Sequence, residues 1–108
     1  MTHYLVQLAY TPEAWAAMVN RPHDRSEVIQ PMIERAGGSI IGMWFCFGDY
    51  DVVGVFQMPD NTSAKAIEFV VLASGAIKTA RVTPLMSMGE GLQALKRACD
   101  IRYQPPTA

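Results

Sequence analysis

The chain has 108 residues, of which half are hydrophobic and 18% are charged, so it has enough apolar surface for one folded domain and is not disordered. Nine basic and ten acidic side chains give a net charge of −1, without the basic stripe that nucleic-acid binding needs. Two cysteines are too few for a disulfide framework and no signal peptide or membrane span is present, so we expect a soluble, cytoplasmic protein with neither a nucleic-acid nor a membrane partner.

The first third of the chain predicts a strand followed by two helices. Residues 4–10 form a short apolar run that ends at a turn signal. Thr11-Pro12-Glu13 then supplies an N-cap, a proline for the first helical position and a first-turn acid. A longer helix is expected from about Asp24 to Gly37-Gly38, and Pro31 within it predicts a kink or a restart of the helix.

Two β-rich runs, 39–47 and 50–58, flank Gly48-Asp49 and predict a β-hairpin. The register that pairs Phe47 with Tyr50 also pairs Trp44 with Val53, and alternation then gives the hairpin two faces. One face is wholly apolar and should lie under the helices: Ile41, Met43, Phe45, Phe47, Tyr50, Val52, Phe56 and Met58. The other face is mixed: Ile40, Gly42, Trp44, Cys46, Asp51, Val53, Val55 and Gln57.

The remaining residues predict a helix, a strand and a terminal helix. The first of these covers about 62–73, with a buried stripe of Ala66, Phe69, Val70 and Ala73. A strand is expected at about 77–86. Ser87 and Glu90 have the spacing of a capping box and begin an amphipathic helix that ends near Cys99, with Leu92 and Leu95 on its apolar side.

The β-α-β-β-α-β order predicts an α+β, ferredoxin-like fold: a four-stranded antiparallel sheet with an added C-terminal helix. We assign residues 1–86 to the ferredoxin-like part and 87–108 to a helix and tail of the same domain. The helices can cover one sheet face only, and the mixed face is too apolar to remain in water. We therefore expect a homodimer or higher homo-oligomer in which the mixed faces pack together as a dimeric α/β barrel.

The hairpin also carries a family resemblance. Trp44-Phe45-Cys46-Phe47-Gly48-Asp49-Tyr50-Asp51-Val52-Val53, followed by Pro59-Asp60, resembles the GYD-domain family, whose signature is a Gly-x-Tyr-Asp hairpin that enters an apolar strand. The likeness extends from Tyr4 to about Met86. It implies a dimeric α/β-barrel fold but no particular chemistry, because the wider superfamily includes monooxygenases, isomerases and haem enzymes.

Two groups of residues are candidates for a functional site. Tyr50 and Asp51 could act as a catalytic acid/base pair, or Asp51 could accept hydrogen bonds that hold the hairpin. Strand parity groups a second set on the mixed face, where it could line a small ligand pocket against the partner: Gln7, Trp44, Asp51, Thr79, Arg81 and Thr83. Arg81 could instead form an ion pair with Asp51 across the barrel.

No pattern indicates a cofactor or a metal. His3 and His23 lack ligand spacing, and Cys46 is expected to be a plain buried thiol. The segment Arg21-Pro22-His23-Asp24-Arg25 lies beside a helix N-terminus and could bind an anion, but a solvated, self-paired surface is the favoured interpretation. We expect a protein that binds a small ligand or serves as an accessory or assembly subunit. The alternative is a cofactor-independent enzyme, of the oxygenase or isomerase type, that uses Asp51 and Tyr50 in the barrel.

Overall fold

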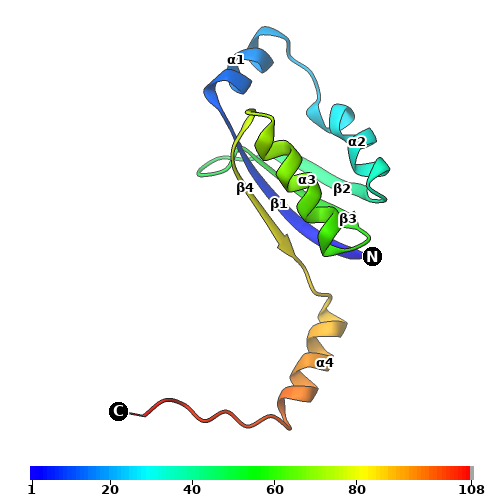
Figure 1. The fold of residues 1–108 in the computed structure, drawn as a ribbon, viewed down its shortest axis with the longest axis vertical. Helices are drawn as coiled ribbons and strands as arrows, with labels where there is room; N and C mark the ends of the chain where they lie inside the picture. Colours follow the sequence, from blue (N-terminus) through cyan, green and yellow to red (C-terminus); the bar gives the residue numbers. More distant parts are fainter. Residues whose placement is uncertain (108) are drawn as a thin grey trace.

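A computed structural model describes residues 1–107 and confirms the ferredoxin-like α+β fold. Its elements are β1 (Thr2–Tyr10), α1 (Pro12–Asn20), α2 (Arg25–Arg35), β2 (Ser39–Phe45), β3 (Val52–Met58), α3 (Asn61–Ala73), β4 (Ile77–Pro84) and α4 (Met88–Ala98). The strands pair antiparallel in the order β2-β3-β1-β4 (Figure 1). None of the helices in the described residues is long and apolar enough to cross a membrane.

Local signals in the sequence determine where the helices begin. Thr11, Asp24 and Asp60 are the N-caps of α1, α2 and α3, and each side chain accepts a hydrogen bond from a backbone amide in the first turn. At Asp60 the bond comes from the Ser63 amide at 2.7 Å, and it lowers the pKa of this carboxyl. The restart that we expected at Pro31 does not occur, because α2 is continuous through this residue.

The end of α2 is fixed by two adjacent glycines. Gly37 adopts a φ of 85°, which suits glycine, and its amide donates to the Glu34 carbonyl. The amide of Gly38 donates to the Ile33 carbonyl at 3.0 Å, which completes a Schellman motif. A Cβ at Gly38 would overlap the Gln57 carbonyl oxygen. The chain therefore crosses closely over β3 as it leaves the helix.

The predicted hairpin register is confirmed, but the faces of β2 differ from the prediction. Trp44 pairs with Val53, as expected. A register shift between Ile40 and Gly42 turns Ile40 toward the core and leaves Ile41 56% exposed, so these two residues exchange the places that alternation gave them.

The apolar residues at the end of the hairpin are also more exposed than expected. Phe45 is 66% exposed on the edge strand, and Phe47 lies beyond the sheet and is fully exposed. The strands end at Phe45 and resume at Val52, so the connection is longer than the two-residue link that Gly48-Asp49 suggested.

The buried side of α3 is not the one that the sequence predicted. Ala64, Ile67, Glu68 and Val71 face the sheet, whereas the expected stripe of Ala66, Phe69, Val70 and Ala73 faces outward. Phe69 and Val70 are 60% and 57% exposed. Both sides of this helix carry apolar residues at helical spacing, so periodicity alone did not decide between them.

The terminal helix α4 lies beyond the end of the sheet (Figure 1). Its capping box is confirmed, because the Ser87 hydroxyl accepts from the Glu90 amide and the Glu90 carboxylate accepts from the Ser87 amide. The burial that we expected for Leu92 and Leu95 is not found within the chain, where they are 50% and 69% exposed. The molecule is consequently elongated, with extents of 57 × 37 × 23 Å.

The crossing at Gly38 gives a first prediction. Gly38→Ala should lower the free energy of unfolding by about 1–3 kcal/mol, because the added methyl group must displace backbone of β3. Urea denaturation followed by circular dichroism measures this change. Gly89→Ala is the matched control, since a Cβ there meets nothing closer than 3.8 Å. Equal stability of the two variants would contradict the close approach.

Candidate functional site

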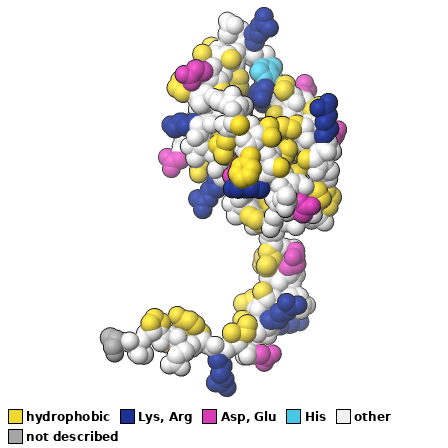
Figure 2. All heavy atoms as spheres, viewed as in Figure 1, with side chains coloured by type: hydrophobic (Ala, Val, Ile, Leu, Met, Phe, Trp, Pro, Cys, Tyr) yellow, Lys and Arg dark blue, Asp and Glu magenta, His cyan; other side chains and the backbone are white. Residues whose placement is uncertain are grey.

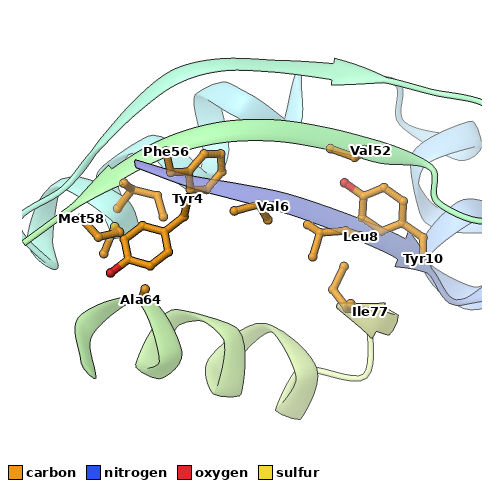
Figure 3. Close-up of a cluster of buried hydrophobic side chains, with 10 residues drawn as sticks. Tyr4, Val6, Leu8, Tyr10, Val52, Phe56, Met58, Ala64 and Ile77 are labelled. Atoms are coloured by element: carbon orange, nitrogen blue, oxygen red, sulfur yellow. The ribbon is translucent and has the colours of Figure 1, made fainter. Parts of the chain in front are cut away.

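A cavity of about 90 Å³ lies between the helix-covered face of the sheet and helices α2 and α3. Alternate residues of β1 form its floor, and Figure 3 shows Tyr4, Val6, Leu8 and Tyr10 along this strand, with Ala64 on α3. Apolar side chains of the two helices form the opposite wall: Ile29, Met32, Ile33, Ala64, Ile67 and Val71. The lining is therefore mostly apolar, as is usual for small-molecule sites.

Tyr10 and Arg25 bring polar groups to this cavity. Tyr10 is 7% exposed, and burial raises the pKa of its phenol above the ordinary value of 10.0, although the nearby Arg25 guanidinium acts in the opposite direction. The Tyr10 ring packs edge-to-face on Trp15, with the centroids 5.2 Å apart. Tyr10 thus remains a neutral hydrogen-bond donor at neutral pH, beside a cation.

The charge of Arg25 is not balanced by a carboxylate. Within residues 1–107 the one ion pair joins Lys65 and Glu68, whose Nζ and Oε1 atoms are 2.7 Å apart. The Arg25 Nη1 instead lies 3.3 Å from the Nε2 of His23, and the Nδ1 of that imidazole is bonded to the Arg21 carbonyl at 2.9 Å. Arg25 therefore has no ion-pair partner among these residues, although the Asp51 carboxylate also acts on Tyr10 and raises the pKa of its phenol.

Glu68 is a buried carboxylate in the same wall. It is 9% exposed and bonds to Lys65, which is itself largely exposed and lies 5.4 Å from the centre of the Phe69 ring. Lys65 pairs with this carboxylate and does not itself line the cavity. The lining therefore holds one cation, Arg25, and one lysine-paired carboxylate, Glu68.

Five of the predicted site residues lie on the other face of the sheet: Gln7, Trp44, Thr79, Arg81 and Thr83, which pairs with Leu5. The pairing of the strands places Trp44, Val53, Gln7 and Arg81 in one row, and Thr79 pairs with Ala9. We call this side of the sheet the open face. A Cβ at Gly42 would overlap the Trp44 indole, so this ring lies over the strand, where it is 58% exposed.

None of these residues lines the cavity described above. The pocket that we expected between the mixed face and a partner stays a prediction, because it needs a second chain. The cavity of the single chain lies on the helix side, where α2 and α3 stand over the sheet, whereas no element among residues 1–107 stands over the open face.

Asp51 connects the hairpin to β1. Its Oδ2 accepts a hydrogen bond from the Tyr10 amide at 2.9 Å, and its own amide donates to the Leu8 carbonyl at 2.8 Å. Tyr50 contributes its carbonyl, which accepts from the Cys46 thiol at 3.2 Å. Neither side chain lines the cavity, so these contacts favour the structural interpretation of Asp51 over the catalytic one.

Within the described chain no ion pair joins Asp51 to Arg81. The physical reason is the strand order, in which β1 separates β3 from β4. Two strand spacings amount to about 9–10 Å, which is too far for a direct contact between neighbouring rows. The residue that pairs with Arg81 is Gln7.

The sequence analysis missed Tyr10 and Glu68 as site residues. One signal was available for Tyr10, because Tyr4, Val6, Leu8 and Tyr10 alternate along one strand and must share a face. Glu68 gave a weaker signal, as a charged residue between Ile67 and Val71 on a helix. Arg25 belongs to the segment that we considered for anion binding, but we favoured a solvated surface there and did not connect Arg25 to a cavity.

The fold and the cavity define a small ferredoxin-like α+β protein with an enclosed apolar site beneath its helices. The family model of the GYD domain matches residues 4–95, which is most of the chain. The chain therefore belongs to the GYD domain family. The match continues past Met86, where we expected the likeness to stop, and includes most of α4. Among curated proteins, none matches the chain.

The contacts of Asp51 give a second prediction. Asp51→Ala should lower the free energy of unfolding by about 1–3 kcal/mol, because the Tyr10 amide loses its acceptor in a half-buried position. Asp51→Asn keeps an oxygen acceptor and should cost less. Asp49→Ala, in the exposed part of the same connection, should stay within about 0.5 kcal/mol of the original protein. Chemical denaturation measures all three, and an unaffected Asp51→Ala variant would refute the structural role.

Proposed function

We propose that this protein binds a small, largely apolar carboxylate in the cavity between the sheet and helices α2 and α3. One observation carries the proposal: the cation that lines the apolar cavity, Arg25, has no ion-pair partner among the described residues and lies next to the neutral phenol of Tyr10. A guanidinium and a phenolic O–H together suit an anionic oxygen, because both donate hydrogen bonds and one carries positive charge.

The volume of the cavity limits the size of the ligand. A dry cavity of roughly 150 Å³ accommodates benzene. At about 90 Å³ this cavity has room for only a few non-hydrogen atoms, or for the apolar end of a longer molecule whose other end leaves the cavity. A short-chain carboxylate meets this limit and has the required charge.

The ligand proposal gives a third prediction, which uses butyrate and 1-butanol as probes of equal chain length. In ¹H–¹⁵N NMR titrations, butyrate should shift amides of β1, α2 and α3 saturably and bind at least about tenfold more tightly than 1-butanol, because only butyrate carries a charge. Arg25→Gln should remove this preference. The absence of saturable shifts with butyrate would refute the proposal.

Filling the cavity provides a second test of the same site. Ala64→Leu should weaken the binding of both probes, because the larger side chain occupies the space beneath α3. Ala17→Leu is the matched control, since Ala17 is exposed on α1 and does not line the cavity. Thermal unfolding of each variant separates lost binding from lost folding. Retained binding in a folded Ala64→Leu variant would place the ligand elsewhere.

We also propose that two copies associate through their open faces to form a homodimer. The open face carries Trp44, Val53, Val55 and Leu5 in adjacent rows, and no element within the described residues covers them. Trp44 is a large aromatic residue that is 58% exposed on the edge strand beside these apolar residues, and such residues are typical of interface anchors. Two such faces can cover one another, as a two-fold symmetric pair requires.

The dimer gives a fourth prediction. Trp44→Arg should raise the dissociation constant at least about tenfold, because it places an unpaired charge between two sheets. Phe47→Arg is the control, as Phe47 is fully exposed outside the sheet. Sedimentation equilibrium at micromolar concentrations measures both. A protein that is monomeric before substitution, or equal masses for the two variants, would refute association through the open face.

A further inference from the structure

Two helices of this chain carry apolar stripes that no other element covers. The α4 stripe consists of Met88, Leu92 and Leu95, which follow one another at helical spacing and are 50–91% exposed. The outer α3 stripe consists of Ala66, Phe69, Val70 and Ala73. Figure 2 shows hydrophobic side chains gathered on the body where α3 lies in Figure 1, and the arm of α4 reaching away from it.

Helix α4 is short and exposed in the single chain. The helix has 11 residues, whereas helices shorter than about 12–15 residues are marginal in water without packing. Its capping box adds only a modest stabilisation. The helix therefore needs a surface against which its stripe packs.

The outer α3 stripe cannot receive α4 of the same chain. Four Cα–Cα steps separate Pro84, the end of β4, from Met88, the start of α4, and they span at most about 14 Å. Helix α3 is the first layer above the sheet, so a helix packed on its outer side forms a second layer, and each layer adds roughly 8–10 Å. Helix α4 thus cannot lie along this stripe on its own body, although α4 of another copy can.

We propose that the α4 stripe of one copy packs along the outer α3 stripe of a second copy. Each chain has one α4 stripe and one outer α3 stripe. Two chains can therefore cover both stripes of each other, or several chains can do so head to tail in a closed ring. In the outer α3 stripe, small side chains at Ala66 and Ala73 allow close approach, and Phe69 and Val70 meet Leu92 and Leu95.

Charge favours an antiparallel arrangement of the two helices. The last turn of α4 carries Lys96 and Arg97. In this arrangement that turn lies beside the first turn of α3, where the Asp60 carboxylate is exposed. The opposed helix dipoles add to the attraction. The contact involves neither the cavity nor the open face. This proposal can therefore be correct or wrong independently of the proposed ligand and of the proposed dimer.

Cross-linking between two different chains tests this contact. Both chains carry Cys46→Ser and Cys99→Ser, one adds Leu92→Cys, and the other adds Val70→Cys and a mass tag. Mild oxidation should give a disulfide-linked species of mixed mass. Gln93→Cys, on the opposite side of α4, is the control for Leu92→Cys and should give at least about tenfold less product. No mixed product, or equal yields from positions 92 and 93, would overturn the proposal.

A second measurement does not depend on cysteines. Leu92→Glu should reduce the mass of the assembly in light scattering, because a charge in the stripe opposes packing. Gln93→Glu adds the same charge on the opposite side and should leave the mass unchanged. Since α4 is exposed in the single chain, neither variant should alter the melting of the body. Equal masses for the two variants would refute the exchange.

Discussion

The structure depends on one geometric constraint: a four-stranded sheet has two faces, and the helices of this chain pack on only one of them. Residues of β1, at the centre of the sheet, therefore meet two different environments in alternation. Tyr4, Val6 and Leu8 are buried under the helices, whereas Leu5 and Gln7 between them are half-exposed. The cavity lies on one side of this strand, and the proposed interface between copies lies on its other side.

Polar groups are buried on the helix-covered side because each one has a hydrogen-bond or ion-pair partner. The Tyr4 hydroxyl donates to Asn61 Oδ1 at 2.6 Å, and Glu68 is paired with Lys65. No buried side-chain nitrogen or oxygen among the described residues lacks a partner. Against this background Arg25 is distinctive, as a cation beside an apolar cavity without a carboxylate of its own.

The sequence predicted the elements well where the signal was local. The N-cap at Thr11, the two glycines after α2 and the capping box of α4 each act within a few residues, and the structure has them as expected. The buried side of α3 was predicted wrongly because two sides of this helix have apolar residues at helical spacing, one with Ala66 and Phe69 and the other with Ala64 and Ile67. Only packing against the sheet decides between them. The cavity could not be predicted, because it combines residues of β1, α2 and α3 that only the tertiary structure brings together.

The central place of β1 also affects how the chain folds during synthesis. This strand leaves the ribosome before its two neighbours, which are β3 at residues 52–58 and β4 at residues 77–84. Until those residues emerge, an apolar strand remains unpaired on both edges, which favours aggregation. Because both pairings of β1 are distant in sequence, the contact order is high and folding is expected to be slow for a domain of this size.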